Sequence, residues 1–174
     1  KTPEQTKAPE KEASRKEASD SQKKKSQKKK YIALTFDDGP SSFTDRLLDC
    51  LEANNAKATF FMVGKEIEYF SDQVKRMETL GCELGNHTYS HTDLATLAPE
   101  DMSAEIAGVD ELLTELTGHG ATVVRPPYGS VNSSVKETVG TPMILWSIDT
   151  LDWESQDPQK IVDTTLSQVE DGSI

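Results

Sequence analysis

The chain has 174 residues and a formal net charge of −11, but two parts of opposite charge produce that average. Residues 1–30 hold 11 of the 19 Lys and Arg and 5 of the 30 Asp and Glu, a charge of +6, which leaves −17 for residues 31–174. Residues 31–174 are too acidic to be expected to bind nucleic acid, whose phosphates favour a basic surface. No apolar run in the chain approaches the ~20 residues of a membrane span.

Residues 1–30 have the composition of a disordered, Lys-rich tether. Ala is their one apolar residue type, no aromatic residue is present, and the segment ends in KKKSQKKK. Such a segment buries too little apolar surface to offset the entropy of ordering. A basic run can also bind nucleic acid or anionic lipid; that alternative predicts binding that disappears when residues 1–30 are deleted. Because the first residue is Lys rather than Met, we expect an upstream signal or anchor to be missing.

Beyond residue 30, apolar runs of strand length alternate with apolar residues at helical spacing. The expected strands are residues 31–36, 58–63, 82–85, 122–125 and 143–148. The expected helices are residues 43–54, 71–80, 99–117 and 158–169, and residues 173–174 enter a sixth strand. This βαβα order is typical of a parallel sheet, open or closed as a barrel. Residues 31–174 are therefore predicted to form one α/β domain.

The two cysteines, Cys50 and Cys82, are too few for a disulfide framework or a cysteine metal site. Both fall in apolar patterns. Both are predicted to be buried free thiols.

The first polar cluster, Asp37 and Asp38, follows the first expected strand. In parallel α/β folds, sites lie at the carboxyl ends of the strands. Successive side chains of a strand point to different sides, and two neighbouring carboxylates repel each other unless a cation or an arginine separates their roles. A solvated acidic turn is the alternative, since Asp-Gly-Pro is common in turns.

The second cluster holds His87 and His91, two of the three histidines. On a helical turn, both imidazoles share a face and reach one metal ion; a capping pair or a pair at the core edge is the alternative. With one carboxylate added, the set is typical of catalytic metal sites, and the second aspartate is then free to act as a general base. His119, which lies between two glycines in a loop, is predicted to be exposed and without function.

The third and fourth clusters follow the fourth and fifth expected strands. Arg125 is suited to holding a carboxylate, and the Pro-Pro-Tyr-Gly turn after it fixes the backbone so that an N–H can face an oxyanion. Asp149, Asp152 and Trp153 offer two acids and an aromatic ring suited to stacking on a sugar. A rigid turn with a surface arginine, and a helix-start loop with a half-buried Trp, are the alternatives.

In this order the four clusters resemble the polysaccharide deacetylases with a NodB-type homology domain, carbohydrate esterase family four. The matching segments are TFDDGP (35–40), HTYSH (87–91), RPPY (125–128) and DTLDW (149–153). The Gly-Asn before the histidines and the SIDTLDW stretch most resemble bacterial peptidoglycan N-acetylglucosamine deacetylases. The resemblance covers residues 31–174 and implies a distorted (β/α) barrel.

The resemblance also implies a role for each matching residue. Asp37 is the expected general base, with Arg125 orienting it. Asp38, His87 and His91 are the expected metal ligands, usually for zinc (Zn2+), with another divalent transition metal such as Co2+ as the alternative. In the remaining motifs, Tyr128 is expected to help hold the oxyanion through its N–H, Trp153 to form a wall of the groove, and Asp152 to orient a catalytic histidine.

That histidine belongs to a fifth family motif, L-x-H on the next strand, which residues 31–174 do not contain. The family's barrel also needs about two further strands. We therefore expect residues 31–174 to be an incomplete, open form of the barrel, either a fragment of a longer enzyme or the product of a truncated gene. A form without the acid histidine is expected to bind metal better than it turns over substrate.

The function that the resemblance implies is metal-dependent hydrolysis of acetamide groups on N-acetylglucosamine residues of a cell-wall polysaccharide of the peptidoglycan type, with release of acetate. The expected location is extracellular or on the cell surface, and the expected partner is the N-acetylated glycan. An O-acetyl esterase acting on xylan is one alternative, because an alcohol leaves with less help from an acid. A non-catalytic glycan-binding pseudoenzyme is the other.

Overall fold

The computed structural model describes residues 29–174, so the predicted tether lies outside the described residues except for its last two, which are exposed. Four strands form one parallel sheet in the order of the chain: β1 (Thr35–Gly39), β2 (Thr59–Met62), β3 (Glu83–Asn86) and β4 (Val123–Val124). The longer helices are α1 (Thr44–Ala53), α3 (Ser71–Thr79), α4 (Pro99–Thr117) and α7 (Pro158–Gln168). Shorter helices are α2 (Gly64–Tyr69), α5 (Ser133–Thr138) and α6 (Asp152–Ser155), with 3-10 turns η1 (Leu94–Thr96) and η2 (Pro127–Gly129).

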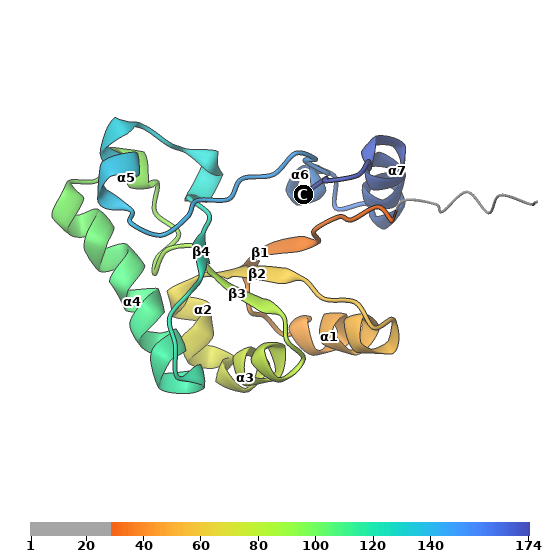
Figure 1. The fold of residues 1–174 in the computed structure, drawn as a ribbon, viewed down its shortest axis with the longest axis horizontal. Coiled ribbons are helices and arrows are strands. Elements are labelled where there is room, and N and C mark those ends of the chain that lie inside the picture. Colours follow the sequence, from red (N-terminus) through yellow and green to blue (C-terminus); the bar gives the residue numbers. More distant parts are fainter. Residues whose placement is uncertain (1–28) are drawn as a thin grey trace, which may run out of the picture.

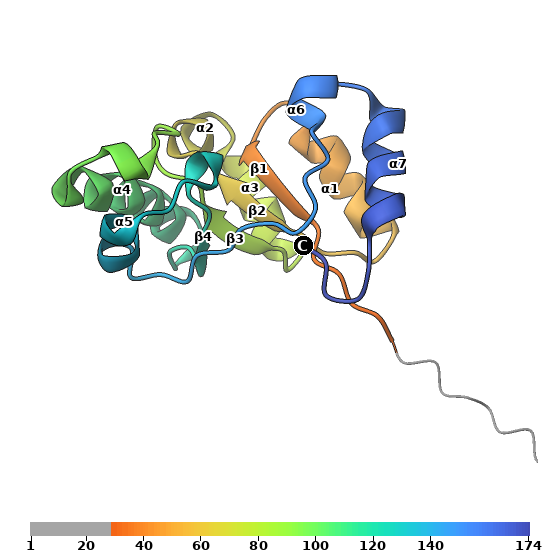
Figure 2. The same ribbon diagram turned by 90° about the horizontal axis from the view of Figure 1, so that it is seen from above.

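Helices surround the sheet, with α4 and α5 toward one end of the molecule and α6 and α7 toward the other (Figures 1 and 2). The main core lies between the sheet and helices α1 to α4, where buried side chains include Leu48, Phe60, Val74 and Val109. A second cluster lies around α5 and the first turns of α4. Within residues 29–174, no helix combines the length and hydropathy that crossing a bilayer requires.

The helices end where the sequence predicts. Pro99 opens α4. Proline has no backbone N–H, and at the first position of a helix that N–H would have no partner. Gly118 follows the last turn in the left-handed conformation, φ 91°, that a glycine adopts freely. The short helices α2, α5 and α6 are not among the predicted elements, because four to six residues carry too little apolar periodicity to be recognised.

The first strand is shifted along the chain from its predicted position. Residues 31–34 precede β1, and part of this segment pairs with the end of the chain, since the N–H of Ala33 donates to the carbonyl of Ser173 at 2.9 Å. The strand instead continues through Asp37 to Gly39, because Phe61 and Met62 of β2 pair with it there. The acidic residues therefore belong to the strand itself.

The prediction of a fifth strand at residues 143–148 is wrong. Only Met143 pairs with β4, as an isolated bridge to Val124. The next two carbonyls, of Ile144 and Leu145, accept hydrogen bonds from the side chain of Arg125 and not from a neighbouring strand. Further on, the N–H groups of residues 147 and 148 both donate to the carbonyl of Ile174. The expected sixth-strand entry thus lies between residues 31–33 and 147–148 without forming a strand.

The two cysteines differ from each other. Both are free thiols, as predicted, and Cys82 is buried. Cys50, however, is exposed. Its neighbours Leu48 and Leu51 turn toward the core, and Cys50 lies on the opposite face of α1.

Candidate active site

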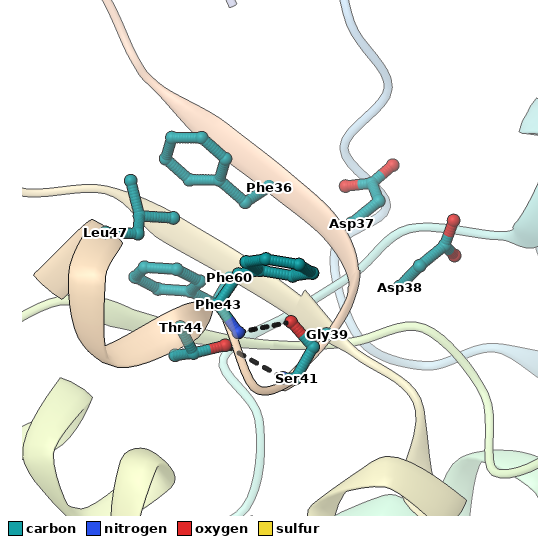
Figure 3. A pocket seen from close by; sticks show the side chains of 9 residues that line it. All are labelled: Phe36, Asp37, Asp38, Gly39, Ser41, Phe43, Thr44, Leu47 and Phe60. Atoms are coloured by element: carbon teal, nitrogen blue, oxygen red, sulfur yellow. Dashed lines mark hydrogen bonds between the residues drawn. The ribbon is translucent and has the colours of Figure 1, made fainter. Parts of the chain in front are cut away.

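Asp37 and Asp38 project to the same side of β1, contrary to the alternation expected of a regular strand. The register of β1 against β2 shifts between Asp37 and Gly39, and Asp38 has a φ of 66°. A bulge of this kind redirects the side chain of the extra residue. Figure 3 shows both carboxylates on the side of the strand away from Phe36. The strand therefore presents two acids together.

The two histidines come from the end of β3, but from a loop and not from a helical turn as expected. His87 follows β3 directly and is buried, whereas His91 is partly exposed and has a φ of 58°. Their rings lie 5.0 Å apart between centroids. The loop between them thus turns back so that both imidazoles face one point, which a helix would have achieved through i and i+4 spacing.

Asp38, His87 and His91 form one cluster. Their nearest ligand atoms all lie within 4.8 Å of one another, and this is the one such group of potential metal ligands among residues 29–174. The Oδ1 atom of Asp38 lies 3.4 Å from Nε2 of His87 and 3.1 Å from Nε2 of His91. The strand bulge and the loop therefore bring together the three residues predicted as ligands.

The chemistry of this cluster suits a divalent cation. The Nδ1 atom of His87 lies 2.6 Å from the carbonyl of Arg125, which can only accept, so Nδ1 carries the proton. In the neutral ring, Nε2 then directs a lone pair at the carboxylate of Asp38. Two facing lone pairs require a proton or a metal ion between them, and a carboxylate with two imidazoles is a usual ligand set for zinc.

Arg125 connects the cluster to Asp37. Its side chain is 2% exposed, and its Nη1 donates to Oδ1 of Asp37 at 2.7 Å and to Oγ1 of Thr35 at 2.9 Å. Its other nitrogens donate to the carbonyls of Ile144 and Leu145. The guanidinium lies over the ring of Phe61, 4.0 Å from the centroid. The predicted pairing of Arg125 with Asp37 is therefore present, and both groups are fixed from several elements.

The two carboxyl groups differ in their acidity. Burial raises the pKa of Asp37 above its ordinary value of 3.8, against the opposing effect of Arg125. When the imidazoles are protonated, the pKa of Asp38 is lowered, first by its hydrogen bond with His87 and also by the charges of His87 and His91, against the raising effect of burial. Neighbouring acids whose environments move their pKa values in opposite directions are suited to different roles, one as a proton acceptor and one as a ligand.

The turn after Arg125 lies beside the cluster. Tyr128 has a φ of 61° and is exposed, and its hydroxyl lies 3.4 Å from Nδ1 of His91. The ring of Trp146, which no motif singled out, lies beside this turn: a Cβ added at Gly129 would lie 3.1 Å from it. A hollow of about 310 Å³ lies at β1, and its lining includes Phe36, Phe43 and both aspartates of the strand (Figure 3).

Asp152 and Trp153 lie on α6, apart from these contacts. Asp152 accepts a hydrogen bond from the hydroxyl of Thr150 at 3.3 Å, and Trp153 is 71% exposed. Asp149 accepts from the N–H of Leu151 at 2.9 Å and so shapes the start of α6. In the described part of the chain, no hydrogen bond or ion pair joins these three motif residues to the Asp38 cluster. Their predicted roles stay predictions.

Two polar residues that sequence reasoning did not assign hold the histidine loop. Asn86 is fully buried, and its Oδ1 accepts from the N–H of Thr88 at 2.8 Å. Glu105, on α4, accepts from Ser90. The position of Asn86 next to His87 is a signal that could have found it. Glu105 lies 15 residues from Ser90, and nothing in the sequence links the two. His119, as predicted, is exposed, and it pairs with Glu78 away from the site.

An Asp-His-His cluster with a second aspartate beside it at the carboxyl end of a parallel sheet is the arrangement typical of metal-dependent hydrolases. The family model described as polysaccharide deacetylase matches residues 24–141. The chain belongs to this family.

Curated relatives agree with this assignment. The chain is 36% identical over 144 residues to the peptidoglycan-N-acetylmuramic acid deacetylase PdaC of Bacillus subtilis, covering 82% of this chain and 31% of the relative. It is 40% identical over 147 residues to a peptidoglycan-N-acetylglucosamine deacetylase of Bacillus cereus, covering 82% of this chain and 54% of that protein. The chain therefore spans between about a third and about a half of the length of these two relatives.

The fold is shared with solved structures. A structure described as T48 deacetylase with substrate has a TM-score of 0.81 to this chain at 40% identity, covering 83% of this chain and 73% of that one. The predicted α/β fold of the NodB type is confirmed by this similarity and by the parallel sheet.

Proposed function

We propose that this chain carries the site of a zinc-dependent deacetylase that removes acetyl groups from N-acetylglucosamine residues of a cell-wall polysaccharide of the peptidoglycan type. The observation that carries the proposal is the Asp38, His87 and His91 cluster beside the ion pair between Asp37 and the buried Arg125. The peptidoglycan deacetylases among the relatives support a polymer of the peptidoglycan type, and those named N-acetylglucosamine deacetylases support the choice of sugar.

In this proposal Asp38, His87 and His91 hold the metal ion. When bound, such an ion polarises a carbonyl and lowers the pKa of a water molecule. Zinc is favoured by the two imidazoles and one carboxylate, and Co2+ accepts the same ligands.

Asp37 is the proposed general base. Its carboxylate is held by Arg125 at 2.7 Å, so one oxygen is fixed and the other is free to accept a proton from the attacking water. Its raised pKa favours that role, because a base with a higher pKa takes a proton more readily. The backbone N–H of Tyr128 is the proposed donor to the developing oxyanion.

The remaining roles follow from the family resemblance. Trp153 would form a wall of the glycan groove, and Asp152 would orient and tune the histidine that the L-x-H motif supplies in this family. We further propose that the protein acts outside the cell or at its surface, with residues 1–30 as a tether.

Acetate release distinguishes this function from its alternatives. A zinc-loaded form of the chain extended to include an L-x-H motif is incubated with N-acetylglucosamine oligomers, with peptidoglycan and with acetylated xylan, and both acetate and free amine are measured. The proposal predicts acetate and amine from the first two substrates, and no release by the Asp37→Asn variant. Release from xylan alone identifies an O-acetyl esterase. Binding of glycan oligomers without release of acetate from any substrate identifies a glycan-binding pseudoenzyme.

A further inference from the structure

The segment between the two histidines adopts a costly conformation. Thr88 and His91 have φ values of 68° and 58°, in the left-handed region that non-glycine residues seldom adopt. Thr88 is also fully buried, and its Oγ1 has no hydrogen-bond partner among the described residues. Such a segment persists only when its surroundings fix it from several sides.

Near His87, the backbone and the neighbouring side chain supply this support. The N–H groups of Gly64 and Lys65, at the start of α2, donate to the carbonyls of Thr88 and Tyr89 at 3.1 and 3.0 Å. The amide of Asn86 joins the N–H of Thr88 to α4, since its Nδ2 donates to the carbonyl of Ile106 at 2.9 Å. His87, directly after a strand, is thus fixed by the sheet and by these contacts.

Near His91, the support comes from Glu105 on α4. One carboxylate oxygen accepts from the hydroxyl of Ser90 at 2.6 Å, and the other accepts from its N–H at 2.8 Å. The backbone carbonyl of Glu105 accepts from the N–H of Tyr89 at 3.0 Å. Three hydrogen bonds therefore join one residue of α4 to the two residues that precede His91.

We propose that Glu105 is a positioning residue for the metal site, which sets the place of His91 by holding Ser90. This inference rests on the proposed function only in that Asp38, His87 and His91 bind a metal ion. Glu105 does not contact the metal ligands, so it acts through the backbone: Ser90 is the residue directly before His91, and a shift of Ser90 moves the imidazole away from Asp38. Residues that orient metal ligands typically contribute about 10- to 100-fold to metal affinity.

The dissociation constant for zinc in the full chain tests this inference, measured by competition with a chromophoric chelator. We expect Glu105→Ala to bind zinc at least about 10-fold more weakly than the unmodified chain, because both bonds to Ser90 are lost. Glu105→Gln is expected to stay within about threefold of the unmodified chain, since its amide oxygen accepts from the N–H of Ser90 and its NH2 donates to the hydroxyl. Glu111→Ala, at an exposed position of the same helix, is the matched control and leaves the affinity unchanged.

Two further readouts separate positioning from general destabilisation. In the metal-free chain, Glu105→Ala is expected to lower the free energy of unfolding, obtained from the thermal midpoint, by less than it lowers the free energy of zinc binding. The visible spectrum of the Co2+ form is expected to change because His91 has moved. Equal zinc affinity in Glu105→Ala and Glu111→Ala overturns the proposal. If Glu105→Ala does not fold, Ser90→Ala replaces it, and an unchanged zinc affinity in that variant overturns the proposal as well. If the unmodified chain binds no zinc, the proposed metal site itself is refuted. That outcome differs from a failure of the Glu105 proposal alone, in which the unmodified chain and Glu105→Ala bind zinc equally well.

Discussion

Replacing Arg125 by lysine is expected to destabilise the fold strongly, although the positive charge is kept. The guanidinium makes four hydrogen bonds at once, to Asp37, Thr35 and the carbonyls of Ile144 and Leu145, with distances between 2.7 and 3.0 Å. A lysine ammonium is a point charge on a flexible stem and cannot reproduce that fork. It can keep the contact with Asp37, but the two carbonyls then lose their donor.

The size of the effect follows from those lost contacts. Each carbonyl left without a donor costs about 1 kcal/mol, and the loss of the planar contact with Phe61 at 4.0 Å adds about 0.5 to 1 kcal/mol. We therefore expect the free energy of unfolding to fall by about 2 to 3 kcal/mol. Urea denaturation followed by circular dichroism measures this change.

Arg76→Lys is the matched control. The guanidinium of Arg76 also makes several hydrogen bonds to carboxylates, those of Asp45, Asp49 and Glu52, but these lie on the exposed face between α1 and α3. Exposed ion pairs contribute little to stability because water screens them. Equal shifts of the denaturation midpoint in Arg125→Lys and Arg76→Lys would refute the view that the buried guanidinium joins β1, β4 and residues 144–145.

Three further variants test other parts of the account. In a form of the chain extended to include an L-x-H motif, Asp37→Asn is expected to keep zinc binding and to lose turnover, and near-normal acetate release by this variant would exclude Asp37 as the base. The pKa of His119 is raised above 6.5 by its hydrogen bond to a backbone carbonyl and by a neighbouring carboxylate. The contribution of His119 to stability is therefore complete below about pH 6.5 and is lost as the pH rises through its raised pKa. A His119→Gln chain whose stability shows the same pH dependence as the unmodified chain would contradict this. Gly64→Ala places a Cβ 2.9 Å from the Cα of Tyr89 and is expected to cost about 1 to 3 kcal/mol, whereas Gly140→Ala, in open space, has little effect; equal stabilities would show that the close approach is unimportant.

The candidate site could be predicted from the sequence because of the rule that parallel strands end at one edge of a sheet. Asp38 lies at the end of β1, His87 follows β3 and Arg125 follows β4, so their proximity required no knowledge of the loops. The helices α1, α3, α4 and α7 were predictable for a similar reason, since each shows apolar residues at helical spacing or a proline or glycine at its end.

Details that depend on tertiary contacts could not be predicted. The bulge at Asp38 places both carboxylates on one side of β1, and no local signal distinguishes it from a regular strand end. The fifth strand has a suitable apolar run, but the side chain of Arg125 uses the carbonyls of Ile144 and Leu145. The link from Glu105 to Ser90 joins residues on separate elements and leaves no pattern in the sequence.

The central claim is that Asp38, His87 and His91 form a metal site, and the zinc content of the purified chain tests it most directly. Elemental analysis after dialysis against a low concentration of zinc is expected to give about one ion per chain for the unmodified protein and for His119→Ala. The same measurement on Asp38→Ala and His87→Ala is expected to give almost none. Unchanged stoichiometry in both of these variants, or no bound zinc in the unmodified chain, would contradict the assignment.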